Sequence, residues 1–162
     1  MFRRIAVVAL ITAGLGGCGP GSRPDAAASA SRLLEAIVHG DRQAFEAAID
    51  RPAVRDDVRR QLTTLAHATG LEIDGGPSEF ALDRMITPEA ITVVDASSGQ
   101  ALTAAPGPDE VAQQMKRLGA DRACLRETPQ AEDCALTFAR SEDRWRLVGM
   151  KAMGLTIEVA GD

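Results

Sequence analysis

The chain has 162 residues and a formal net charge of −5, with 45% apolar and 25% charged residues, as expected for one globular domain. The acidic balance opposes binding to nucleic-acid phosphates. Only 3% of the residues are aromatic and none is Tyr, so side chains on which bases or sugar rings could stack are scarce, and we expect no nucleic-acid partner.

The first seventeen residues have the layout of an export signal. Arg3 and Arg4 supply a positive start, and residues 5–15 form an apolar run that is too short to span a bilayer as a helix. The sequence Leu-Gly-Gly-Cys follows at residues 15–18, so two small residues stand directly before Cys18.

This arrangement resembles the signal peptide of bacterial lipoproteins. The resemblance implies that residues 1–17 are removed and that Cys18 is acylated as the mature N-terminus. The chain would then be anchored in a membrane of the bacterial envelope and face the periplasm, and Gly19 favours the outer membrane over the inner one. The alternative is an ordinary secretory signal in which Cys18 occurs by chance.

The segment after Cys18 is small and polar, with Gly and Pro among its residues. Such a composition predicts a flexible tether over residues 18–31. The remaining residues, 32–162, are enough for a single domain with one modest core.

Helical spacing dominates the first part of this domain. The apolar residues of 32–38 share one stripe, and Asp41 is placed to cap a second helix. Pro52 suits the first turn of the longest predicted helix, which Gly70 ends. The face of this helix that we expect to pack on the core carries Val54, Val58, Leu62, Leu65 and Thr69.

Three further segments complete the helical part. Residues 80–86 predict a short helix, and residues 109–118 return to helical spacing. Between them, residues 88–95 begin like a helix with Thr87, Pro88 and an acid but continue with β-branched residues, so that helix and strand both remain open there.

The C-terminal part changes to an alternating pattern. Apolar and polar residues alternate over residues 134–139, 145–150 and 155–159, and a polar turn lies at residues 141–144. We therefore predict an α+β fold in which N-terminal helices precede a C-terminal antiparallel β-meander of three to four strands.

Two cysteines remain after Cys18. Cys124 and Cys134 flank a polar segment that contains Pro129, which is typical of a hairpin loop with the cysteines facing each other across the strands. In an oxidising compartment this arrangement favours a disulfide bond. The alternatives are two free thiols, or a metal or catalytic site.

Four short motifs carry a family resemblance. They are His-Gly-Asp at residues 39–41, Asp-Arg-Pro-Ala-Val-Arg at 50–55, Thr-Pro-Glu at 87–89 and Trp-Arg-Leu at 145–147. Together they resemble the family of small bacterial proteins called domain of unknown function 2939. The resemblance implies a helical N-terminal half joined to a β-meander, and it brings no known activity.

Asp50 and Arg55 form the sharpest polar pattern. They could make a polar site at a helix start; the alternative is that Asp50 caps the helix and Arg55 pairs with a nearby carboxylate. His39 and His67 lack the spacing of a zinc site and suit helix C-termini. We expect no catalytic residue, metal or cofactor.

These features favour a non-enzymatic envelope lipoprotein that binds a protein or assembly partner. The alternative is a small-molecule-binding or enzymatic domain with a pocket between the helices and the sheet. An exposed apolar patch over a closed core would favour the first. A cavity of several hundred Å³, on the scale of known ligand pockets, that holds a carboxyl or histidine with a strongly shifted pKa would rule out the first.

Overall fold

A computed structural model describes residues 23–70 and 75–159 of the chain. The helices are α1 (Arg23–Val38), α2 (Arg42–Ala48), α3 (Arg51–Ala68), α4 (Glu79–Met85), the short 3-10 helix η1 (Pro88–Ala90) and α5 (Pro108–Gln114). The strands are β1 (Ile91–Asp95), β2 (Met115–Arg117), β3 (Arg122–Arg126), β4 (Cys134–Ser141), β5 (Arg144–Met150) and β6 (Leu155–Val159).

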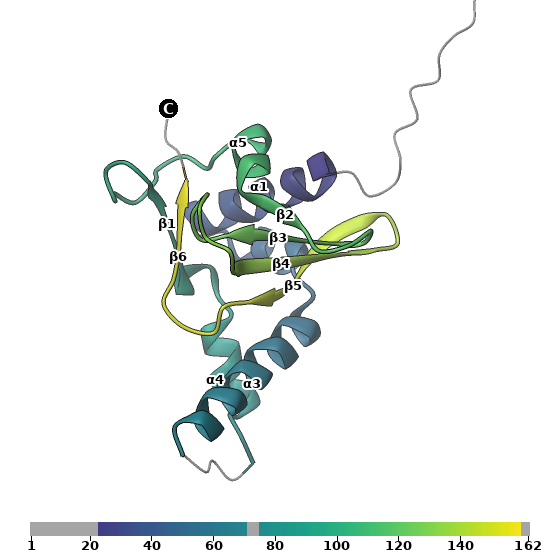
Figure 1. Ribbon diagram of the computed structural model, residues 1–162, viewed down its shortest axis with the longest axis vertical. Coiled ribbons are helices and arrows are strands. Elements are labelled where there is room, and N and C mark those ends of the chain that lie inside the picture. The colour runs from purple at the N-terminus through teal and green to yellow at the C-terminus, as the bar shows by residue number, and fades with distance from the viewer. Residues whose placement is uncertain (1–22, 71–74, 160–162) are drawn as a thin grey trace, which may run out of the picture.

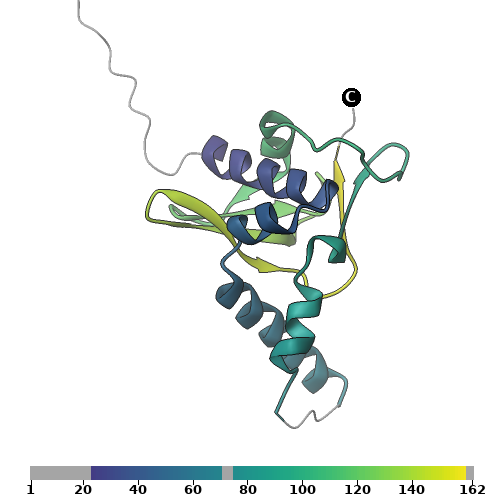
Figure 2. The ribbon, with the colours of Figure 1, turned by 180° about the vertical axis from the view of Figure 1, so that it is seen from behind.

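The α+β prediction is confirmed, and the four strands β2, β3, β4 and β5 form an antiparallel sheet in that order. Helix α1 lies across this sheet, as Figure 2 shows from behind the view of Figure 1. Leu33 and Leu34 of α1 are fully buried, as are Phe45 of α2 and Leu147 of β5. Burial of these side chains, together with Phe138 of β4, makes the central core.

The predicted tether is wrong over residues 23–31, because α1 begins at Arg23 and not near Arg32. Ala26, Ala27 and Ala30 in this stretch are completely buried. Alanine has the highest helix propensity, and its small side chain lets α1 pack closely on α5. The rest of the predicted tether and the predicted signal lie outside the described residues.

One predicted element changes in the structure, and one segment that remains open in the sequence takes a definite form. The helix expected over residues 109–118 ends at Gln114, and Met115–Arg117 instead form strand β2, which pairs with β3. The open segment after Thr87 is a single 3-10 turn followed by strand β1.

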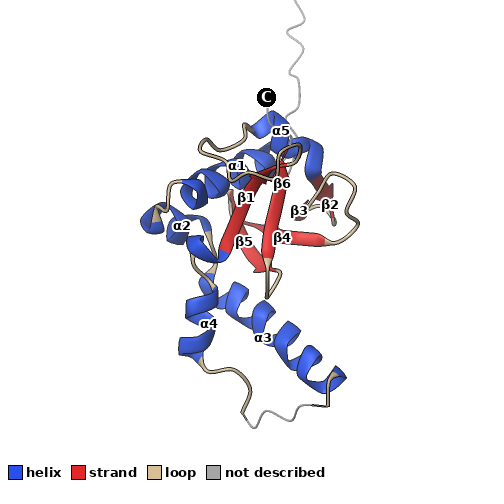
Figure 3. Ribbon diagram, turned by 90° about the vertical axis from the view of Figure 1, so that its left-hand side faces the viewer, coloured by secondary structure: helices blue, strands red, loops and turns tan. Residues whose placement is uncertain are grey.

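Strand β6 is not a further strand of the meander. It pairs in parallel with β1, and the two form a separate ribbon that stands beside the larger sheet (Figure 3). Ile91 and Val93 of β1 are buried together with Leu155 and Ile157 of β6, so the ribbon closes the core on that side.

Helices α3 and α4, which we call the helical arm, extend from the rest of the molecule, which we call the body (Figure 1). The backbone N–H of Asp50 donates to the carbonyl of Leu147 at 2.8 Å and fixes the start of α3 to strand β5. A β-carbon on Gly149 would lie 2.7 Å from an oxygen of Asp57, so the absence of a side chain there lets α3 approach the strand.

The base and the outer half of the arm differ in burial. Val54 and Val58 of α3 and Leu82 of α4 are fully buried, whereas Leu65 is 46% exposed. The predicted apolar stripe of α3 is therefore buried only in its first half. Among the described residues, no helix combines the length and apolar character needed to cross a membrane.

Candidate functional site

The structure separates Asp50 and Arg55 rather than joining them in one site. Asp50 is the N-cap of α3, and its carboxylate accepts a hydrogen bond of 3.2 Å from the Ala53 N–H. Arg55 lies one turn further along and reaches α4, where its guanidinium donates two hydrogen bonds of 2.7 and 2.6 Å to Asp83. The capping interpretation of Asp50 is confirmed, and the partner of Arg55 is 28 residues away in the chain.

Asp83 is the centre of a charged network between the two helices of the arm. Besides Arg55, it accepts a hydrogen bond of 3.0 Å from Arg51, which also contacts Glu46 of α2. The hydrogen bonds from Arg55 and then Arg51 lower the pKa of Asp83, so the carboxylate stays ionised. The hydrogen bond to Glu46 raises the pKa of Arg51.

The network continues along the arm, and a separate ion pair joins α2 to η1 in the body. Arg59 of α3 pairs with Glu79 at the start of α4, and Arg42 of α2 donates to Glu89 of η1 at 2.8 Å. The Glu89 backbone N–H and then Arg42 lower the pKa of Glu89. Arginine forks on carboxylates are directional, so the network fixes how α4 lies on α3. This is a positioning role and involves no reactive group.

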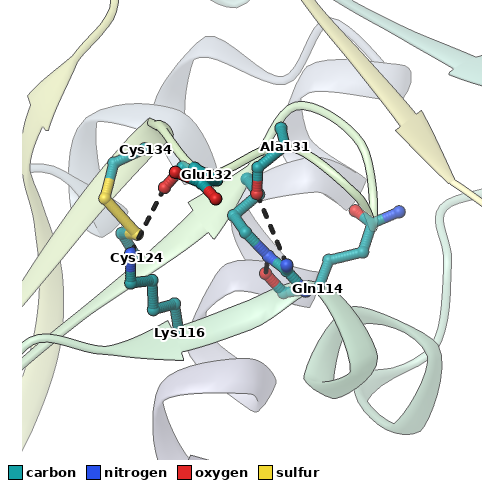
Figure 4. The surroundings of a disulfide bond; sticks show 7 residues. Gln114, Lys116, Cys124, Ala131, Glu132 and Cys134 are labelled. Atoms are coloured by element: carbon teal, nitrogen blue, oxygen red, sulfur yellow. Dashed lines mark hydrogen bonds between the residues drawn. A yellow bond between two sulfur atoms is a disulfide. The ribbon is translucent and has the colours of Figure 1, made fainter.

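Cys124 and Cys134 form a disulfide bond, with their Cα atoms 5.5 Å apart (Figure 4). The prediction that the two cysteines lie directly opposite each other is wrong. A bulge after Leu125 places Arg126 opposite Cys134, while Cys124 faces Thr137. Lys116 also donates to the Glu132 carbonyl at 3.4 Å, so the loop between the cysteines is held to β2.

A cleft with a volume of about 520 Å³ opens between α1, α2 and the β4–β5 hairpin. Trp145, the single tryptophan of the chain, lies in its lining and is 9% exposed. The charged side chains of the lining are Asp25, Arg32, Asp143, Arg144 and Arg146. The two carboxyl groups with lowered pKa values, Asp83 and Glu89, lie elsewhere.

The arm presents apolar side chains to solvent. Phe80 at the start of α4 is 71% exposed, and Arg84 lies over its ring at 5.8 Å. A groove of about 250 Å³ on the same arm is lined by Leu62 and Ala66 of α3 and by residues 75–77. Phe80 is not part of the groove lining, but exposed apolar side chains of this kind are typical of a surface that binds another protein.

His39 and His67 are both exposed, and no group of three or more metal-ligating side chains occurs within residues 23–70 and 75–159. Sequence patterns missed two other features: the exposed Phe80 and the cleft arginines. Phe80 could have been recognised, because it lies two residues, or about 200° around the helix, from the buried Leu82.

No protein-family model, curated protein or solved structure matches this chain. The resemblance to domain of unknown function 2939 therefore stays a prediction.

Proposed function

We propose that the protein is a lipid-anchored accessory protein of the bacterial envelope, held at Cys18, whose helical arm binds a protein partner. The observation that carries the proposal is the apolar surface of the arm, with Phe80 71% exposed and Leu65 46% exposed. Burying one such aromatic side chain on binding removes an energetically costly exposed apolar area from water.

The build of the arm supports a binding role. Its charged network holds α4 in place without covering Phe80, so the exposed ring is presented in a fixed position. A preorganised anchor loses less conformational freedom on binding than a mobile one. The arm also extends away from α1, the helix that follows the predicted anchor (Figure 1).

Photo-crosslinking in intact cells tests the arm. A photoreactive residue at position 80 or 65 is expected to form an adduct with one envelope protein. The matched control is position 118, since Leu118 is 44% exposed but lies outside the arm. The same adducts from all three positions would contradict a specific surface on the arm.

The anchor is tested by labelling cells with a palmitate analogue. The native chain is expected to be labelled and to fractionate with membranes, and the Cys18→Ala variant to lose both properties. Equal labelling of the two would refute acylation at Cys18.

One observation favours a second candidate function, the binding of a small molecule or an enzymatic role. It is the cleft of about 520 Å³ lined in part by Trp145, which lies between the helices and the sheet. The arginines that line this cleft indicate that its ligand is an anion.

A further inference from the structure

We propose that the cleft between α1, α2 and the β4–β5 hairpin binds the phosphate of an anionic phospholipid headgroup in the membrane that anchors the chain. The inference rests on the proposed anchor at Cys18 for its position at the bilayer. Its chemistry comes from the arginines of the cleft.

The first step is the charge of the cleft. Its lining has three arginines, from α1 and β5, against two aspartates, although the chain as a whole has a net charge of −5. Arg144 and Arg146 form no ion pair with any carboxylate in the described part of the chain, whereas Asp143 is paired with Arg140 at 3.4 Å. Two guanidinium groups are thus available to an external anion.

The second step is the neighbourhood of the cleft. Arg122 pairs in register with Ala139, and the N–H of Arg140 donates to the Asp121 carbonyl at 2.9 Å. The turns of the β2–β3 and β4–β5 hairpins, together with the arginines near them, therefore lie at the same end of the sheet. Although Asp121, Glu142 and Asp143 also occur in these turns, arginines remain in excess there. Clusters of this kind next to a membrane attract anionic lipids.

The third step is the distance to the membrane. Four residues lie between Cys18 and Arg23, the first residue of α1, and the five steps along the chain span about 18 Å at most when fully extended. Asp25 in the first turn of α1 lines the cleft together with Arg144 of the hairpin. Figure 2 shows the β4–β5 hairpin reaching out beneath the start of α1. An acylated Cys18 would hold the cleft close to the headgroups.

The fourth step concerns the choice of ligand. An acidic protein segment would also suit arginines, but nothing in the position of the cleft brings one there, whereas the short span from Cys18 brings the bilayer. The arm, which we assign to the protein partner, extends away from this end (Figure 1). The structure thus favours lipid at one end and protein at the other.

The test uses the mature chain with Cys18→Ser, so that no acyl chain contributes. Flotation is measured with vesicles of phosphatidylcholine alone and with three parts in ten replaced by phosphatidylglycerol. Binding is expected only with phosphatidylglycerol, and it should weaken as salt rises. Each arginine near an anionic surface is worth about fivefold in affinity, so Arg144→Gln with Arg146→Gln is expected to bind about 30-fold more weakly.

The matched control is Arg60→Gln with Arg84→Gln, which removes the same charge from the arm and is expected to retain binding. Trp145 emission reports on folding and on occupation of the cleft in every variant. If the variant with both Arg144→Gln and Arg146→Gln fails to fold, Arg32→Gln replaces it as the cleft variant. The lipid assignment would be overturned by an equal loss of vesicle binding in the arm pair or by equal binding to both vesicle types. It would also be overturned if millimolar inorganic phosphate displaced the vesicles or if a polyglutamate peptide bound more tightly.

These results are separable from the proposed anchor. Labelling at Cys18 without preference for phosphatidylglycerol would leave the anchor and overturn the headgroup site. Absence of labelling with retained, arginine-dependent vesicle binding would refute the anchor and support the site.

Discussion

The body buries Phe45, Phe138 and Leu147 to 1% exposure or less, whereas the outer half of the arm leaves Leu65 and Phe80 46% and 71% exposed. The body is held by apolar burial, which scales with the area removed from water. Beyond its buried base, the arm relies on partly exposed ion pairs, each of which contributes little to stability. The same chain thus builds a body held by apolar burial and a projection whose orientation is set by ion pairs.

The largest expected effect comes from the core of the body. Phe138→Ala removes a ring that is 1% exposed and leaves a cavity in the core of the body. We expect the free energy of unfolding to fall by about 3–5 kcal/mol. Chemical denaturation checks this, and a loss below about 1 kcal/mol would show that the body does not depend on this burial.

The disulfide should rank second. Replacing Cys124 and Cys134 by Ser opens a loop with a sequence separation of 10. The denatured chain gains freedom, so we expect a loss of about 2–3 kcal/mol. Thermal unfolding of the native and Ser forms measures the difference. A native chain whose mass shows two free thiols would contradict the bond.

Acid should loosen the arm before the body. The pKa of Asp83 is lowered in the folded state by Arg55 and Arg51. Its contribution is therefore complete above the ordinary value of 3.8 and is lost as the pH falls through the lower, folded value. Hydrogen exchange in α4, compared with Asp83→Asn, should differ at neutral pH and converge in strong acid. A difference that persists in strong acid would rule out this carboxylate.

Removing the arginine of this pair should have a local effect. Arg55→Gln loses both hydrogen bonds to Asp83, but the buried Leu82 and Ile86 still hold α4. We expect the melting temperature to change by no more than about 2 °C while amide exchange in α4 becomes faster. Arg60→Gln, whose partner Asp57 lies on the same helix, is the control and should leave α4 unchanged.

The sequence predicted what local rules determine. Asp41 and Asp50 cap their helices as predicted, and the alternation around Phe138 gives a strand of the antiparallel sheet. Prediction from the sequence failed where a segment distant in the chain determines the secondary structure or the strand pairing. Met115–Arg117 become a strand because β3 pairs with them, and β6 joins β1 rather than the meander.

The same difference between local and distant partners applies to the disulfide, the ion pair of Arg55 and the cleft. Cys124 and Cys134 could be paired from spacing and composition, since their loop is short. The partner of Arg55 could not, because Asp83 lies on another helix. The cleft could not be predicted either, because its lining joins α1, α2 and β5, which are far apart in the chain.

We propose that Phe80 serves binding and not stability, and a comparison of two variants can decide this. Phe80→Ser and Leu118→Ser are compared for thermal stability and for recovery of the crosslinked partner from intact cells. Both variants should keep the free energy of unfolding within about 0.5 kcal/mol of the native value, because both side chains are exposed. Only Phe80→Ser should lose the partner, and undiminished recovery with Phe80→Ser would show that Phe80 has no role in binding.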